Sequence, residues 1–100
     1  MAVYPEFRLR RYSQFVYGLM HLQLIYPGMS VTSWGRSQAR NAAKGGIPNS
    51  QHLHWTAVDV EWDPGTRPEY GELAGAAARV GLEVVPEPDH DHIELAPGGA

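Results

Sequence analysis

Four of the five histidines lie in two short clusters whose composition suggests a metal site. The first cluster runs from Ser50 to His54 and the second from Asp89 to His92, and Asp59 follows His52 by seven positions. Because the chain contains no cysteine, any bound metal must be held by histidine and carboxylate side chains. A polar surface loop is the plain alternative for one such cluster. Two clusters joined by an aspartate on a predicted strand favour a metal site instead.

Two histidines and one carboxylate suit a catalytic zinc ion, which keeps its fourth position for water. Zinc lowers the pKa of that water and polarises a scissile carbonyl, and a nearby carboxylate can then carry the proton in peptide hydrolysis. Asp89 and Asp91 are the carboxylates next to the second cluster. The residues therefore predict zinc-dependent hydrolysis, with either aspartate as the base.

Side-chain alternation in extended backbone narrows the choice of ligands only in part. It places His52 and His54 on the same face, so spacing alone leaves both as possible ligands. The same alternation places His90 and His92 together and turns Asp89 away from them, unless the chain bends. Pro88 lies where such a bend is expected.

A longer stretch, from about Val31 to Glu94, carries a pattern that covers most of the chain. Its members are Thr32 to Ser37, Asn41, Gly45 and Gly46, Ser50 to His52, Ala57 to Asp59, and Asp89 to His92. In this pattern the stretch resembles the zinc D-Ala-D-Ala carboxypeptidase family, which belongs with lysostaphin-type peptidases and the Hedgehog amino-terminal domain. The signature of the family has S-x-H, then A-x-D, and a final histidine near the C-terminus.

The resemblance implies a complete catalytic centre. It puts His52, Asp59 and His92 on the positions of the zinc ligands, and Asp89 on the position of the catalytic acid and base. It also puts Arg36 on the arginine that stabilises the substrate carbonyl or carboxylate, and a planar guanidinium suits either task.

The resemblance also implies residues that line the substrate site. Ser50 falls on a serine that contacts substrate, and His90 falls on a histidine found beside the site in some members. Trp55 departs from the family, which has glycine there, and a bulky indole at this position would narrow the cleft or change its specificity.

By this resemblance we expect a zinc metallopeptidase that hydrolyses the stem peptides of bacterial peptidoglycan, in a D-Ala-D-Ala carboxypeptidase type of reaction. An L-alanyl-D-glutamate endopeptidase, as in phage endolysins, is the alternative within the family. A zinc-binding module of the cell wall or of a virion, without catalysis, is the alternative outside it. Any of these acts at the bacterial cell wall, and we see no signal peptide. A phage-encoded protein made in the host cytoplasm fits that combination.

Composition limits the other possibilities. A chain of 100 residues with 43% hydrophobic content fits a single domain over residues 1–100, and we expect a monomer. The formal net charge of −3 and the absence of a Lys/Arg block argue against a nucleic-acid partner. No apolar run reaches the roughly 18 residues of a membrane span, so we expect no membrane insertion.

Hydrophobic spacing predicts the elements that would position these residues. An apolar face beginning at Tyr12 predicts a helix from Glu6 to Ile25, stopped by Pro27 and Gly28. We expect a second helix at 37–44, and a third that starts with a capping box of Thr66 and Glu69 and runs to Gly81. Strands are expected at 29–33, 56–60, 82–85 and 91–95. The fold class is therefore α+β, a small antiparallel sheet flanked by about three helices with the zinc site at the sheet.

Overall fold

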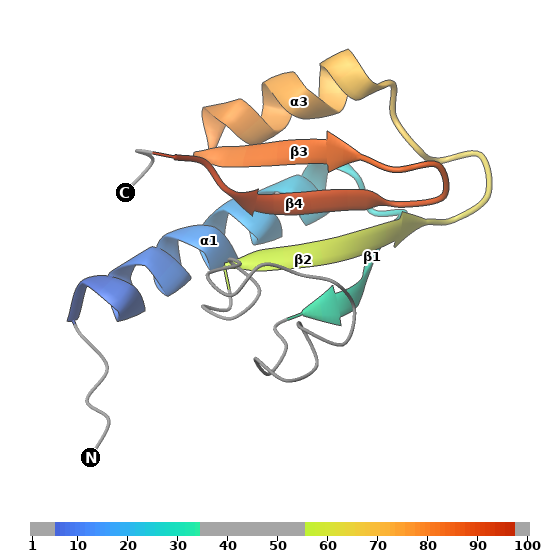
Figure 1. Cartoon of the computed structure of the whole chain (residues 1–100). Coiled ribbons are helices and arrows are strands. Elements are labelled where there is room, and N and C mark those ends of the chain that lie inside the picture. Colours follow the sequence, from blue (N-terminus) through green and yellow to red (C-terminus); the bar gives the residue numbers. More distant parts are fainter. Residues whose placement is uncertain (1–5, 35–55, 98–100) are drawn as a thin grey trace.

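A computed structural model describes residues 6–34 and 56–97 (Figure 1). Within these ranges the elements in chain order are α1 (Glu6–Ile25), β1 (Met29–Trp34), β2 (Ala57–Trp62), α3 (Tyr70–Arg79), β3 (Leu82–Pro86) and β4 (Asp91–Leu95). The described part of the chain is thus α+β, as predicted, with two helices and a sheet of four strands. The helix expected at 37–44 lies outside the described residues.

The four strands form one antiparallel sheet in the order β1-β2-β4-β3. The C-terminal strand β4 is therefore an inner strand, hydrogen-bonded to β2 on one side and to β3 on the other. In the β2–β4 pair, Asp59 lies directly opposite His92. In the β1–β2 pair the register shifts between Val31 and Ser33, where β1 has an irregularity. The predicted antiparallel sheet is confirmed.

Helix α1 has the bounds that its apolar spacing predicts. Phe15, Leu19 and Leu22 follow one another at helical spacing and are buried against the sheet. The helix ends before Pro27, whose ring cannot continue it. Gly28 comes next and lies close to Thr66. A Cβ atom at this position would be only 2.3 Å from Thr66 Oγ1, so a larger residue does not fit here without a shift.

Helix α3 begins differently from the prediction, and the expected capping box is wrong. Glu69 is itself the N-cap, and its side chain accepts a hydrogen bond from the backbone N–H of Gly71 at 3.0 Å. The Thr66 hydroxyl instead donates to the carbonyl of Asp63 at 2.7 Å and closes a turn in which Gly65 has a φ of 77°. The helix starts later because Thr66 is engaged in this turn and Pro68 follows it.

Both helices pack on one face of the sheet, with α1 behind β3 and β4 in Figure 1 and α3 above β3. Side chains of β4 alternate accordingly: Asp91, Ile93 and Leu95 are buried on the helix side, whereas His92 and Glu94 are partly exposed on the other. Within the described residues no helix combines the length and apolar character that crossing a membrane takes. The histidine-bearing face is thus the one turned away from the helices.

Candidate metal centre

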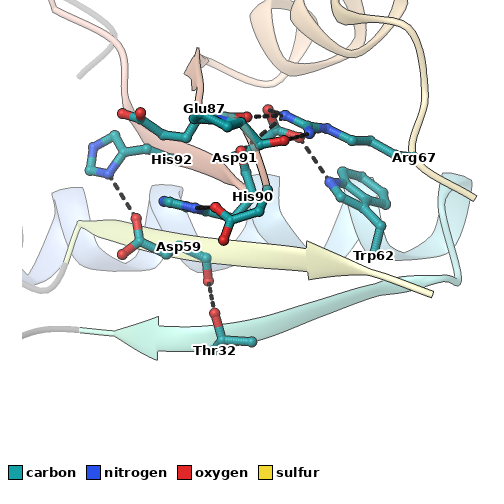
Figure 2. A network of polar contacts seen from close by, with 10 residues as sticks. Thr32, Asp59, Trp62, Arg67, Glu87, His90, Asp91 and His92 are labelled. Carbon is teal, nitrogen blue, oxygen red and sulfur yellow. Dashed lines mark hydrogen bonds and ion pairs between the residues drawn. The ribbon is translucent and has the colours of Figure 1, made fainter. Parts of the chain in front are cut away.

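Asp59 and His92 face one another across the two inner strands of the sheet (Figure 2). His92 Nδ1 lies 3.2 Å from Asp59 Oδ1, and each side chain is about one-fifth exposed. Directly opposed residues of an antiparallel pair project to the same face with their side chains close together. The strand pairing therefore joins two predicted zinc ligands that are 33 positions apart in the chain.

The spacing of these two atoms fits a shared zinc ion. Nitrogen and oxygen ligands lie about 2.0–2.1 Å from zinc, so two corners of a tetrahedral site are roughly 3.3 Å apart. The observed 3.2 Å between Nδ1 and Oδ1 is close to that value. The pair can supply two adjacent corners of a zinc site without rearrangement of the sheet.

His92 also contacts a second carboxylate through its other ring nitrogen. Nε2 lies 2.9 Å from Glu94 Oε1. Histidines that bind a metal through one nitrogen commonly donate the N–H of the other to a carboxylate. Glu94 is absent from the set of site residues that the sequence pattern predicts. The signal that points to its position is the period of two in a strand, which puts residues 92 and 94 on one face.

The chain bends at Pro88 and Asp89 before β4 begins, as expected from the proline. Asp89 is 89% exposed, and its Oδ1 lies 2.7 Å from His90 Nδ1. This hydrogen bond is the main cause that lowers the pKa of Asp89, and a bond to its own backbone N–H adds to it. The carboxylate of Asp89 therefore favours the ionised form that a general base needs.

His90 precedes β4, and its side chain bonds to Asp89. The hydrogen bond with Asp89 raises the pKa of His90, partial burial opposes this, and the negative charge of Asp59 raises it further. Within the described residues, the side-chain hydrogen bond of Asp89 is to His90, whereas Asp59 bonds to His92.

Asp91, the other carboxylate that the sequence offered as a base, has a different role. Its side chain is buried on the helix side of β4, with a residue exposure of 2%. One carboxylate oxygen accepts from Trp62 Nε1 at 2.8 Å, and both accept from the Arg67 guanidinium, at 2.9 and 3.1 Å. A carboxylate held in this way, on the face opposite His92, is unsuited to act as the base.

Other predicted site residues lie outside the described ranges, namely Arg36, Ser50, His52, the alternative ligand His54, and Trp55. Over residues 6–34 and 56–97, no three His, Asp or Glu side chains gather in a way that could hold a metal ion by themselves. A centre with three protein ligands built on Asp59 and His92 therefore needs a third from elsewhere in the chain. His52 remains the prediction for it.

No family model, curated protein or solved structure matches this chain. Support for a function comes therefore from the residues themselves, from their placement on the sheet and from the motif pattern.

Proposed function

We propose that this chain is a zinc-dependent peptidase that hydrolyses stem peptides of bacterial peptidoglycan, with His52, Asp59 and His92 as the zinc ligands. The observation that carries the proposal is the Asp59–His92 pair. Its 3.2 Å spacing suits two corners of a zinc site, and Glu94 lies behind His92 as carboxylates do behind metal-binding histidines. The S-x-H and A-x-D pattern supports the same assignment.

Zinc in such a site supplies Lewis-acid chemistry, since it acidifies water and polarises a carbonyl group. The protein contributes the proton transfers: Asp89 accepts a proton and then delivers it to the leaving amine. The carboxylate of Asp89 is ionised at neutral pH, and its lowered pKa favours that form further; the ionised form is the one that accepts a proton in the first of these steps. Arg36 would bind the substrate carbonyl or carboxylate, and Ser50 and His90 would contact the peptide.

The resemblance favours cleavage between two D-alanines at the end of the stem peptide. Cleavage between L-alanine and D-glutamate is the alternative, and the products distinguish them. The first reaction releases free D-alanine, whereas the second leaves a new amino terminus on D-glutamate. Both substrates belong to the cell wall, so the protein would act outside the cytoplasmic membrane of its target bacterium.

The test combines metal analysis with a digestion. We expect purified protein to hold close to one zinc ion per chain by elemental analysis, and to cut muropeptides in a reaction that a chelator stops and added zinc restores. Mass spectrometry of the products identifies the bond. Protein that is folded, yet binds neither zinc nor any other divalent ion, would overturn the proposal.

A zinc-binding module without catalysis is the second candidate. The exposure of Asp89 and its bond to His90, rather than to the Asp59–His92 pair, favour this reading. The same digestion separates the two candidates. Stoichiometric zinc together with intact muropeptides would establish the binding module and exclude the peptidase.

A further inference from the structure

The side chain of His92 is held between two carboxylates, and its two contacts are not equivalent. Nε2 lies 2.9 Å from Glu94 Oε1, whereas Nδ1 lies 3.2 Å from Asp59 Oδ1. A neutral imidazole carries a single N–H, and ionised carboxylates only accept hydrogen bonds. Neutral His92 can therefore donate to one of the two carboxylates, and its other nitrogen presents a lone pair to the second.

We infer that Glu94 is a positioning residue, which holds the proton of His92 on Nε2 and so leaves Nδ1 as the metal-binding atom facing Asp59. The shorter contact is the better placed for the proton, because N–H···O bonds most often have nitrogen–oxygen distances of about 2.9–3.0 Å, and 3.2 Å is the long end of their range. On the other side, Nδ1 and Asp59 Oδ1 are then two acceptors 3.2 Å apart, and a cation between them removes their repulsion. The metal-binding part of this inference rests on the proposed function.

The position of Glu94 is well suited to this role. It lies two residues after His92 on the inner strand β4, which is paired on both sides. The side chain of Ile93 between them is fully buried in the core and holds the strand in place. Hydrogen bonds to β2 and β3 thus fix the backbone from which both side chains project. An orienting group on a rigid element holds its partner more precisely than one on a loop.

Three variants and one control test the inference. Glu94→Ala removes the acceptor, and Glu94→Met removes it while filling a similar volume, which covers the case that the alanine variant fails to fold. Glu94→Gln keeps an acceptor oxygen but removes the charge. Glu83→Ala is the matched control, since Glu83 is exposed and lies directly opposite Glu94 in the β3–β4 pair. The control removes the same charge from the same part of the sheet.

The first measurement needs no metal. In metal-free protein under mildly alkaline conditions, long-range ¹H–¹⁵N NMR spectra show which ring nitrogen of His92 carries the proton. We expect Nε2–H in the wild type, in Glu94→Gln and in Glu83→Ala. In Glu94→Ala and Glu94→Met we expect a shift toward Nδ1–H, which then donates to Asp59. An unchanged tautomer in both of these variants would overturn the inference.

The second measurement is zinc affinity, obtained by competition with a chelating dye. Loss of a carboxylate that orients a histidine ligand typically weakens metal binding about 10- to 100-fold. We expect a weakening of this size in Glu94→Ala and Glu94→Met, a smaller one in Glu94→Gln, and none in Glu83→Ala.

The two measurements distinguish a failure of the proposed function from a failure of the role of Glu94. A wild type that binds no zinc contradicts the proposed function, while the tautomer still decides the role of Glu94. Normal zinc affinity in Glu94→Ala and Glu94→Met contradicts the positioning role and leaves the peptidase proposal intact.

Discussion

Two polar clusters lie on opposite faces of β4 (Figure 2), because successive residues of the strand point to opposite sides of the sheet. On the helix side, Asp91 joins Arg67 and Trp62. On the other side, His92 joins Asp59 and Glu94. Asp91 and His92, the centres of the two clusters, are neighbours in one histidine- and aspartate-rich motif. The two clusters differ in the partners that each of these residues meets.

The Asp91 cluster is internally balanced. The negative carboxylate meets a positive guanidinium and an indole N–H, and Arg67 also donates to the carbonyls of Glu87, Pro88 and His90 at 2.7–3.1 Å. One arginine thus ties the turn between β3 and β4 to the segment before α3. The charges and hydrogen bonds of the Asp91 cluster are matched within the cluster. We therefore assign Asp91 a structural role and propose no ligand for it.

The His92 cluster has a different composition. Two carboxylates contact one imidazole, and a neutral imidazole donates one proton and presents one lone pair. Carboxylate oxygens and imidazole nitrogens are also ligands that zinc uses. The difference between the clusters teaches that the neighbours of an aspartate, more than its residue type, separate a structural aspartate from a candidate metal ligand.

The largest effect should follow from removal of a proposed zinc ligand. We expect Asp59→Ala to lose stoichiometric zinc and all chelator-sensitive hydrolysis, because two ligands cannot hold zinc at a working concentration. The stability of metal-free protein should change by no more than about 1 kcal/mol, since the Asp59–His92 pair is partly exposed. Elemental analysis and urea unfolding check these expectations. Full zinc content in Asp59→Ala would contradict the assignment of Asp59 as a zinc ligand.

Removal of the candidate base should affect turnover but not binding. We expect Asp89→Ala to lower kcat about 10²- to 10⁴-fold, the usual contribution of general acid–base catalysis. Zinc content should remain close to that of the wild type, because the side chain of Asp89 bonds to His90, which is not one of the proposed ligands. Steady-state rates on muropeptides measure the effect. If activity persists in full, another group must carry the proton.

Asp91→Ala should lower the stability of the protein and leave its zinc affinity unchanged. It strips a buried partner from Arg67 and Trp62, and breaking a buried ion pair commonly costs about 3–5 kcal/mol. We expect a loss near 3 kcal/mol, since Arg67 is partly exposed. Urea unfolding of metal-free protein measures it, with Asp91→Asn as the control that keeps the shape. Zinc affinity of the folded fraction should stay unchanged, so a specific loss of zinc would contradict the structural role.

The smallest effect concerns Tyr26, which supports the Asp91 cluster by packing edge-on against Trp62 at 5.9 Å. Burial raises the pKa of Tyr26, and the hydrogen bond from its hydroxyl to Glu72 Oε2 at 2.8 Å, with the charge of Glu72, raises it further. A raised pKa means that folding favours the neutral phenol. This contribution is complete below the unfolded pKa of about 10 and is lost as pH rises through the folded value.

We therefore expect the stability of the wild type to fall more steeply than that of Tyr26→Phe at alkaline pH. Urea unfolding over a pH series measures the difference. Tyr17→Phe is the matched control, because Tyr17 is 75% exposed. Coincident curves for the wild type and Tyr26→Phe would contradict the coupling.

Local pattern was sufficient for most elements. Helix α1 and strand β4 have the predicted bounds, since an apolar period, a Pro-Gly stop and a flanking turn all act within a few residues. The start of α3 was mispredicted because Thr66 bonds to Asp63 and Gly28 packs against it, and the second of these contacts comes from a distant part of the chain.

For the candidate site, too, the sequence predicts some features and the tertiary structure decides others. The sequence by itself predicted which residues could bind zinc, and strand alternation predicted that His90 and His92 share one face. It left Asp89 and Asp91 as rival bases, and no pairing of His92 with Glu94 was predicted, although strand alternation puts the two on one face. Only the tertiary structure decided that Asp91 belongs to Arg67 and that Asp59 meets His92. The pairing of β2 with β4 joins segments far apart in the chain, and its register depends on how the whole sheet packs against α1 and α3.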